Sequence, residues 1–178
     1  MDQPSPRPAP PRLTLVLGGA RSGKSRHAEG LVTATPPPWI YVATAQAFDD
    51  EMTARIAQHR SRRPTGWRTI EAPLDLAGAI AEHANSGQAV LIDCLTLWLS
   101  NIMLDGRDVE VACDALVDAL ATATGPIVVV SNEVGLGIVP DNTLARRFRD
   151  AQGHLNQQVA ASADRVVLMT AGLPLTLK

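Results

Sequence analysis

A glycine-rich segment directly follows an apolar run near the start of the chain. The run is Leu13 to Leu17, and the segment after it reads Gly18-Gly19-Ala20-Arg21-Ser22-Gly23-Lys24-Ser25. This is the G-x-x-x-x-G-K-[ST] pattern of a phosphate-binding loop, and residues 26–32 continue it as a predicted helix. Glycines let backbone N–H groups curve around phosphate oxygens, and the helix N-terminus adds the positive end of its dipole. The arrangement predicts an α/β fold that binds a nucleotide.

Two residues of this loop carry predicted chemistry. Lys24 is placed to reach the β- and γ-phosphates of a nucleoside triphosphate, and the Ser25 hydroxyl is placed to ligate Mg²⁺. An ordinary glycine turn would have no need of lysine and serine at these offsets. We therefore predict that Lys24 is catalytic and that Ser25 is a metal ligand.

Size and composition narrow the classes of function. The 178 residues, 46% of them hydrophobic, suffice for one well-packed domain and not for two. A net charge of −2 and an aromatic content of 3% argue against nucleic-acid partners. No stretch approaches the roughly 18 consecutive apolar residues of a membrane span, and the N-terminus lacks the apolar segment of a secretory signal. We expect a cytoplasmic protein without membrane insertion. Cys94 and Cys113 lack metal or disulfide spacing and are predicted to be free thiols.

Strand and helix patterns alternate along most of the chain. Residues 1–12 hold five of the 13 prolines and are expected to form an extended arm, which leaves 13–178 as a single domain. The predicted strands are Leu13–Leu17, Trp39–Ala43, Trp67–Ile70, Ala89–Ile92, Ile127–Val130, Arg165–Thr170 and Leu175–Leu177. The predicted helices are Lys24–Val32, Asp49–Arg62, Leu74–Ala84, Leu95–Met103, Val109–Ala123 and Asn142–Ala163.

The strands are almost continuously apolar, which indicates burial on both faces and hence a mostly parallel sheet. The segment Ala171-Gly172-Leu173-Pro174 is too short for a parallel crossover, so the last strand should lie antiparallel at an edge. The predicted fold is the doubly wound type of P-loop nucleotide hydrolases, with a mostly parallel seven-stranded sheet and an antiparallel C-terminal edge strand.

Polar residues follow two of the other predicted strands. Asp93 ends the strand Ala89–Ile92 and resembles the aspartate that holds Mg²⁺ in P-loop proteins, although a cap for the next helix is the alternative. The run from Ser131 to Pro140 follows Ile127–Val130 and is either a substrate loop or an ordinary glycine-bearing connection. We favour the metal role for Asp93, because strand ends at the carboxyl edge of such sheets form the ligand crevice.

His59 lies among cations on its predicted helix. Arg55 lies one turn before it, and Arg62 and Arg63 lie three and four residues after it. Such arginines would bind phosphate and lower the pKa of the histidine, which would keep the imidazole neutral and nucleophilic near pH 7. A solvated basic face is the alternative, and composition alone does not choose between them.

The combined motifs resemble one known family. They are the phosphate-binding loop, Tyr41-Val42-Ala43-Thr44-Ala45, Asp49-Asp50-Glu51-Met52 with Arg55-Ile56 and His59, and Asn132-Glu133-Val134-Gly135 through Ile138-Val139-Pro140. In this order and spacing they are similar to the bifunctional adenosylcobinamide kinase/adenosylcobinamide-phosphate guanylyltransferases of cobalamin biosynthesis. The likeness covers nearly the whole chain beyond the proline-rich arm.

The resemblance implies two reactions and a set of site residues. ATP or GTP phosphorylates adenosylcobinamide, and GMP then passes from GTP to adenosylcobinamide phosphate through a guanylylated histidine, here His59. It also implies Mg²⁺ and assembly as a homo-oligomer, with a trimer as one arrangement. The family's nucleotide-binding positions correspond to Gly18 to Ser25, Ala43, Thr44, Ala45, Arg60, Ser61, Arg62, Arg63, Glu71 and Asp93.

Two departures and two rival functions accompany this prediction. The proline-rich arm lies outside the family core, and Gln58 stands where some relatives have a second histidine. No Asn-Lys-x-Asp guanine motif is present in the sequence, so guanine preference rests on the resemblance. A kinase for another metabolite would have no use for His59. A nucleotide-dependent switch would bind partners and ignore cobinamide.

Overall fold

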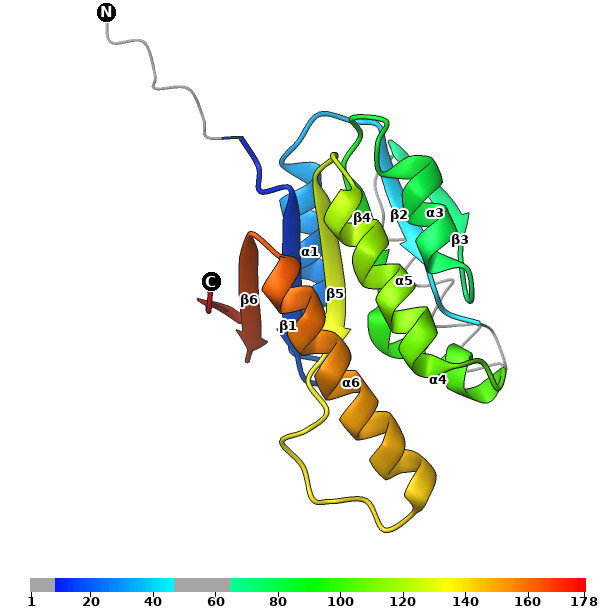
Figure 1. The fold of residues 1–178 in the computed structure, drawn as a ribbon. Helices are drawn as coiled ribbons and strands as arrows, with labels where there is room; N and C mark the ends of the chain where they lie inside the picture. The colour runs from blue at the N-terminus through cyan, green and yellow to red at the C-terminus, as the bar shows by residue number, and fades with distance from the viewer. Residues whose placement is uncertain (1–8, 47–64) are drawn as a thin grey trace, which may run out of the picture.

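The computed structural model describes residues 9–46 and 65–178. They form a seven-stranded sheet with helices on both faces (Figure 1). The strands are β1 (Leu13–Gly18), β2 (Trp39–Ala43), β3 (Trp67–Glu71), β4 (Val90–Asp93), β5 (Ile127–Asn132), β6 (Arg165–Thr170) and β7 (Leu173–Thr176). The helices are α1 (Lys24–Thr33), α3 (Leu76–His83), α4 (Leu95–Leu104), α5 (Val109–Thr122) and α6 (Thr143–Ser162). The predicted helix Asp49–Arg62 and the arm's first eight residues lie outside the described residues.

The sheet has the order β3-β2-β4-β5-β1-β6-β7. All neighbouring strands are parallel except β6 and β7, which pair antiparallel with Leu168 opposite Leu175. The predicted fold class is therefore confirmed, including the antiparallel C-terminal edge. Since β1 lies between β5 and β6, the loop that follows β1 emerges from the interior of the sheet and not from its edge.

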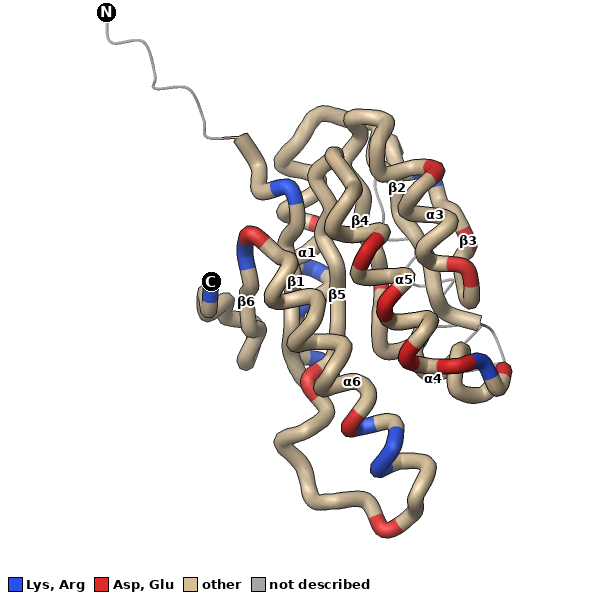
Figure 2. Tube along the Cα trace, viewed as in Figure 1, with Lys and Arg blue, Asp and Glu red and all other residues tan. Residues whose placement is uncertain are grey.

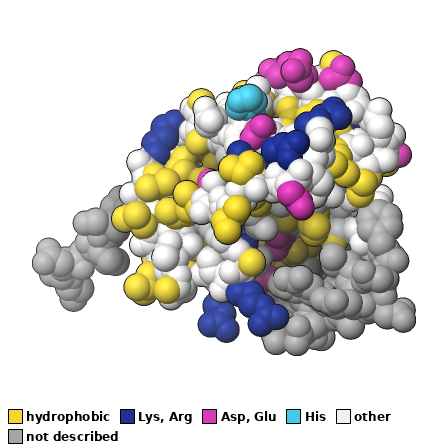
Figure 3. Space-filling view, turned by 90° about the horizontal axis from the view of Figure 1, so that it is seen from below, with side chains coloured by type: hydrophobic (Ala, Val, Ile, Leu, Met, Phe, Trp, Pro, Cys, Tyr) yellow, Lys and Arg dark blue, Asp and Glu magenta, His cyan; other side chains and the backbone are white. Residues whose placement is uncertain are grey.

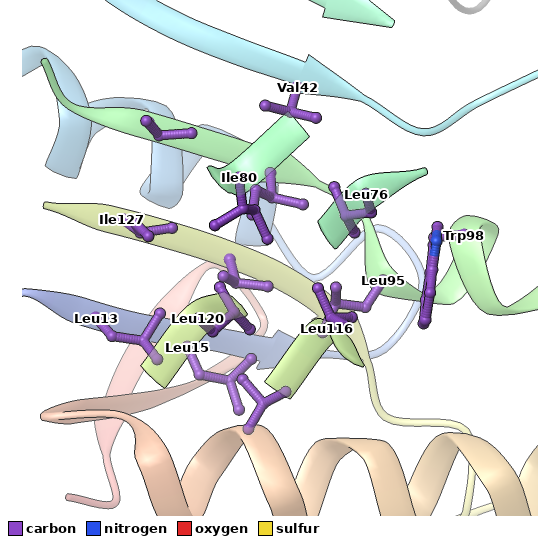
Figure 4. Packing of buried hydrophobic residues seen from close by; sticks show 14 of the residues in the cluster. Leu13, Leu15, Val42, Leu76, Ile80, Leu95, Trp98, Leu116, Leu120 and Ile127 are labelled. Carbon is purple, nitrogen blue, oxygen red and sulfur yellow. The ribbon is translucent and has the colours of Figure 1, made fainter. Parts of the chain in front are cut away.

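Two apolar layers hold the fold together. On one face, α3, α4, α5 and α6 pack over alternate residues of the central strands, among them Leu13, Leu15 and Ile127 (Figure 4). On the other face, α1 contributes Ala28 and Val32 to a smaller cluster. Each fully buried leucine or isoleucine stabilises the fold by about 1.5–3 kcal/mol relative to an exposed one. The central strands are buried on both faces, which is why their sequences lack a polar alternation.

Side chains at the helix starts fix several boundaries. Asp75 accepts a hydrogen bond from the Gly78 N–H at 3.0 Å, so α3 begins at Leu76 and not at Leu74 as predicted. Asp108 caps α5 by accepting from the Glu110 and Val111 N–H groups. The Asn142 side chain caps α6 by accepting from the Ala145 N–H at 2.8 Å.

The C-terminal hairpin turns two residues earlier than predicted. Ala171 and Gly172 both have positive φ, 52° and 80°, as a tight two-residue hairpin turn requires. The last strand therefore starts at Leu173, and Pro174 lies inside it. An edge strand tolerates proline, because its missing N–H is lost on the side that has no neighbouring strand.

Candidate nucleotide-binding site

The phosphate-binding loop leaves the carboxyl end of β1 and runs into α1. Gly18 must be glycine, since a Cβ there would lie 2.5 Å from the Ser22 Oγ and 2.7 Å from the Met169 carbonyl oxygen. Gly23 has a φ of 93° and precedes the first residue of α1. Arg21 has a φ of 55°, the left-handed conformation that alternates backbone direction in anion-binding loops. The loop thus has the curvature that the motif predicts.

Backbone and side-chain hydrogen bonds brace this loop. The Ser22 N–H donates to the Gly19 carbonyl oxygen at 3.3 Å, and the Lys24 ammonium donates to the same oxygen at 2.8 Å. From the β6–β7 turn, the Gly172 N–H donates to the Ser22 carbonyl oxygen at 3.0 Å. The buried Ser22 hydroxyl has no partner among the described residues. The C-terminal hairpin therefore supports the phosphate-binding loop through this contact, which the sequence does not predict.

Asp93 ends β4, two strands away from β1. Its carboxylate accepts a hydrogen bond from the Tyr41 hydroxyl at 3.2 Å. The bond from Asp93 to Cys94 is a cis peptide, and α4 starts at the next residue. The pKa of the buried Cys94 thiol is raised to about 11, mainly by burial and then by the Asp93 carboxylate, against smaller opposing effects of the Leu97 and Thr96 backbone groups.

Thr44 and Asn101 form a polar network at this strand end. Thr44 is fully buried, and its hydroxyl donates to the Cys94 carbonyl oxygen at 2.7 Å while accepting from the Cys94 N–H at 2.8 Å. The Asn101 amide donates to the carbonyl oxygens of Thr44 at 2.8 Å and Pro73 at 3.0 Å. We call Thr44, Cys94 and Asn101 the β4 network.

A second polar network lies at the carboxyl end of β5. The Asn156 Oδ1 accepts from the Ser131 hydroxyl at 2.6 Å and from the Gln152 amide at 3.0 Å. The Asn156 amide donates to the Asn132 carbonyl oxygen at 3.0 Å, and the Gln152 amide also donates to the Ser131 Oγ at 2.9 Å. We call Ser131, Gln152 and Asn156 the β5 network.

The end of β5 is also tied to its other neighbours. The Asn132 N–H donates to the Thr96 hydroxyl of α4 at 2.8 Å. The next residue, Glu133, donates its N–H to the Gly18 carbonyl oxygen at 3.2 Å. The β5 end is therefore attached to α4, α6 and the first residue of the phosphate-binding loop.

The strand ends bring most of the described predicted residues to one edge. Strand pairing places Ala43 beside Asp93 on one side and beside Glu71 on the other. Glu71 ends β3, the outermost strand, and is exposed. The remaining predicted residues, His59, Arg60, Ser61, Arg62 and Arg63, lie outside the described residues. Seen along the sheet from the carboxyl ends of the strands, Figure 3 shows charged side chains of both signs with apolar side chains between them.

Sequence reasoning missed the polar residues that helices supply to this edge. These are Thr96, Asn101, Gln152 and Asn156, all buried. Gln152 and Asn156 are four residues apart, on the same side of α6 as the buried Leu155 and Val159. Polar residues inside an apolar helical stripe are a readable signal, because buried amides are rare without partners.

A hollow lies between the start of α5 and the middle of α6. Its volume is about 870 Å³, and its lining includes Asp114, Arg147, Asp150 and His154. Figure 2 shows acidic positions along α5 and basic positions near the start of α6. None of the predicted nucleotide-binding residues that the structure describes lines this hollow, so it is separate from the phosphate-binding loop.

The donor set formed by the start of α1 and the end of β4 fits a magnesium ion. A serine hydroxyl and a carboxylate, Ser25 and Asp93, are hard oxygen ligands, and Mg²⁺ in nucleotide sites takes one or two protein ligands plus phosphate oxygens and water. The described residues contain no cluster of three or more His, Cys, Asp or Glu side chains placed to hold a metal.

Residues 14–177 match the family described as cobinamide kinase / cobinamide phosphate guanyltransferase. The chain belongs to this family. It is 49% identical over 166 residues to the bifunctional adenosylcobalamin biosynthesis protein CobP of Pseudomonas aeruginosa, which spans 92% of this chain and 96% of that protein. It is 42% identical over 181 residues to the bifunctional adenosylcobalamin biosynthesis protein CobU of Escherichia coli, with 93% and 99% covered.

Membership in the cobinamide kinase / guanyltransferase family confirms the resemblance and makes the chain an enzyme of that class. Solved structures support the fold. The ATPase EscN of the enteropathogenic E. coli type III secretion system aligns with a TM-score of 0.57 at 11% identity, covering 90% of this chain and 43% of that one. The flagellar accessory protein FlaH of Methanocaldococcus jannaschii aligns with a TM-score of 0.53 at 13% identity, covering 95% and 80%. Among the described residues no helix is both long and apolar enough to span a membrane.

Proposed function

We propose that this enzyme phosphorylates adenosylcobinamide and then transfers GMP from GTP onto the resulting phosphate, giving adenosylcobinamide-GDP. The observation that carries the proposal is the phosphate-binding loop at the end of β1, within a family match that runs over residues 14–177. The relatives named above are bifunctional adenosylcobalamin biosynthesis proteins, which supports two activities in one chain. One domain, residues 13–178, would hold both.

In the kinase step the phosphate-binding loop holds a nucleoside triphosphate, ATP or GTP. Backbone N–H groups of the loop contact phosphate oxygens, and Lys24 leaves the Gly19 carbonyl oxygen to bind the β- and γ-phosphates. Ser25 and Asp93 would hold Mg²⁺, which would neutralise negative charge on the phosphates. The adenosylcobinamide hydroxyl attacks the γ-phosphorus, its proton leaves to water or to a base, and the nucleoside diphosphate departs.

In the transfer step His59 is the nucleophile. A neutral imidazole nitrogen attacks the α-phosphorus of GTP, a P–N bond forms, and the bond to pyrophosphate breaks. A phosphate oxygen of adenosylcobinamide phosphate then attacks the same phosphorus, and the P–N bond breaks to regenerate the histidine. Arg60, Ser61, Arg62 and Arg63 stabilise charge on the transferred group.

The remaining nucleotide contacts belong to the ends of β2 and β3. We assign Ala43, Thr44, Ala45 and Glu71 to the nucleotide site, since these positions correspond to the family's. The enzyme is proposed to act as a homo-oligomer, and the cytoplasmic location stays a prediction.

Product analysis separates the two steps. Purified enzyme is incubated with adenosylcobinamide, GTP and Mg²⁺, and the corrinoid products are identified by mass spectrometry. The wild type is expected to form adenosylcobinamide-GDP. His59→Ala should stop at adenosylcobinamide phosphate, and Lys24→Ala should leave adenosylcobinamide unchanged. Formation of adenosylcobinamide-GDP by His59→Ala would contradict the assigned nucleophile.

A further inference from the structure

Thr44 follows β2 directly and touches the backbone at the end of β4. Its side chain is fully buried, and its single hydroxyl proton is given to the Cys94 carbonyl oxygen. The Thr44 hydroxyl oxygen also accepts a hydrogen bond from the Cys94 N–H at 2.8 Å. The Thr44 N–H faces the Asp93 carbonyl oxygen at 3.4 Å. A hydroxyl used in both directions and closed to solvent has no donor left to offer a bound nucleotide.

Asn101 adds a second tie from α4. Its amide nitrogen donates both protons, one to the Thr44 carbonyl oxygen and one to the Pro73 carbonyl oxygen after β3. Because α4 starts directly after Cys94, this one side chain links the segments that follow β2, β3 and β4. Asn101 is itself buried, so its hydrogen bonds are shielded from competing water.

These contacts converge on Asp93. The β4 network holds the backbone on its C-terminal side, and the Tyr41 hydroxyl donates to its carboxylate. Mg²⁺ requires near-ideal octahedral geometry at about 2.0–2.1 Å, so a small displacement of a carboxylate ligand weakens its binding. The β4 network therefore fixes the position of the backbone that carries Asp93.

We propose that Thr44 and Asn101 are positioning residues for Asp93: they act on nucleotide binding through the metal-binding carboxylate and do not touch the nucleotide through their side chains. This inference rests on the proposed nucleotide site and revises one assignment within it. The Thr44 side chain belongs to the support of Asp93, and only its neighbours Ala43 and Ala45 remain as direct contacts. Asn101 is added as a residue that the motifs did not identify.

The test is GTP binding by calorimetry, with Mg²⁺ and with EDTA. Thr44→Val keeps the shape and loses the hydroxyl, Thr44→Ser keeps the hydroxyl, and Asn101→Ala removes the second tie. Thr44→Val and Asn101→Ala should weaken GTP binding in Mg²⁺ about tenfold, the equivalent of one buried hydrogen bond. In EDTA their Kd values should equal that of the wild type, and Thr44→Ser should bind like the wild type in both buffers. Asn101→Ala carries the test alone if Thr44→Val does not fold.

Matched controls use the same substitutions away from the site. Thr14→Val changes a buried threonine in the first half of β1, and Asn85→Ala removes an amide whose oxygen binds Thr124 at the amino-terminal edge of the sheet. Both should bind GTP like the wild type in Mg²⁺ and in EDTA, even where their melting temperatures fall.

Three results would overturn the proposal. Weaker binding of Thr44→Val in EDTA as well would place its side chain on the nucleotide. A lower melting temperature with wild-type affinity in Mg²⁺ would leave Thr44 and Asn101 a purely structural role. Wild-type binding that is equal with and without Mg²⁺ would remove the metal role of Asp93 too. By contrast, Mg²⁺-dependent binding without any guanylylated protein would contradict only the proposed transfer chemistry.

Discussion

The two buried polar networks at the carboxyl edge differ in what they hold. In the β4 network one hydroxyl pairs with both backbone groups of Cys94, and one amide pairs with two further carbonyl oxygens. In the β5 network the side chains pair largely with one another, and only Asn156 reaches the backbone, at Asn132. The Gln152 Oε1 atom is buried without a partner among the described residues.

The β4 network thus mainly supports the backbone, whereas the β5 network mainly joins α6 to the end of β5. A buried backbone group that loses its partner costs about 1–3 kcal/mol, whereas an already unpaired acceptor carries that cost in the native state. Removing a side chain of the β4 network therefore leaves a buried backbone group newly unpaired, which destabilises the protein. Removing Gln152 instead removes an acceptor that is already unpaired among the described residues. Substitutions in the β4 network should therefore lower the free energy of unfolding more than substitutions in the β5 network, although both networks are buried.

The largest expected effect is that of Thr44→Val on stability. The substitution leaves the buried Cys94 N–H without its partner and leaves the Cys94 carbonyl oxygen with the Trp98 N–H alone. We expect the free energy of unfolding to fall by about 2–4 kcal/mol, measured by urea denaturation. Thr44→Ser should lose less than half of this amount. A Thr44→Val change below about 0.5 kcal/mol would remove the distinction between the networks.

Asn156→Ala should have the second-largest effect on stability. It removes the donor to the Asn132 carbonyl oxygen and the acceptor shared by Ser131 and Gln152. Since only one backbone group loses a hydrogen bond, against two in Thr44→Val, we expect a loss of about 1–3 kcal/mol in the same denaturation experiment. A loss larger than that of Thr44→Val would show that side-chain pairing is worth more here than backbone pairing.

Gln152→Leu should change stability by less than about 1 kcal/mol, because an apolar side chain of similar size removes an unpaired acceptor along with two donated hydrogen bonds. Thermal denaturation of the variant beside the wild type measures the difference. Destabilisation by about 3 kcal/mol or more would mean that the Gln152 oxygen has a partner in solution, such as a buried water.

The effect that is smallest near neutral pH concerns the Cys94 thiol inside the β4 network. Burial raises its pKa from 9.0 to about 11, so the neutral thiol is favoured in the folded state. The stability from this group is complete below pH 9 and is lost as the pH rises from 9 towards 11. Native protein should resist alkylation by iodoacetamide at pH 8 and react after unfolding. Rapid native modification at Cys94, located by peptide mass mapping, would contradict its burial.

The fold was predictable because its signals are local and mutually consistent. The strand Leu13–Leu17 followed by the glycine-rich loop, the apolar run around Ile92 and the short turn at Gly172 together specify a parallel sheet with an antiparallel edge. The predicted boundaries were wrong where a helix cap or a tight turn sets the end of an element. The Asp75 cap delays α3 to Leu76, and the tight turn at Ala171 draws Pro174 into the last strand.

Sequence reasoning could propose site residues only where consecutive residues form a motif or where a residue ends a predicted strand. The loop Gly18 to Ser25 and the strand-end Asp93 follow from position alone, whereas the assignment of Thr44 and Glu71 needed the family resemblance. Asn101, Gln152 and Asn156 reach the edge from helices that are distant in sequence, so their roles depend on packing. The roles of His59 and the arginines that follow it stay predictions, since these residues lie outside the described ones.

The central claim, covalent transfer of GMP through His59 in a P-loop domain, is tested most directly by intact-protein mass spectrometry after incubation with GTP and Mg²⁺. The account predicts an acid-labile GMP adduct on the wild type and none on His59→Ala, together with pyrophosphate release by the wild type alone. An unmodified wild-type protein that releases no pyrophosphate would contradict the claim, as would an adduct that persists in His59→Ala.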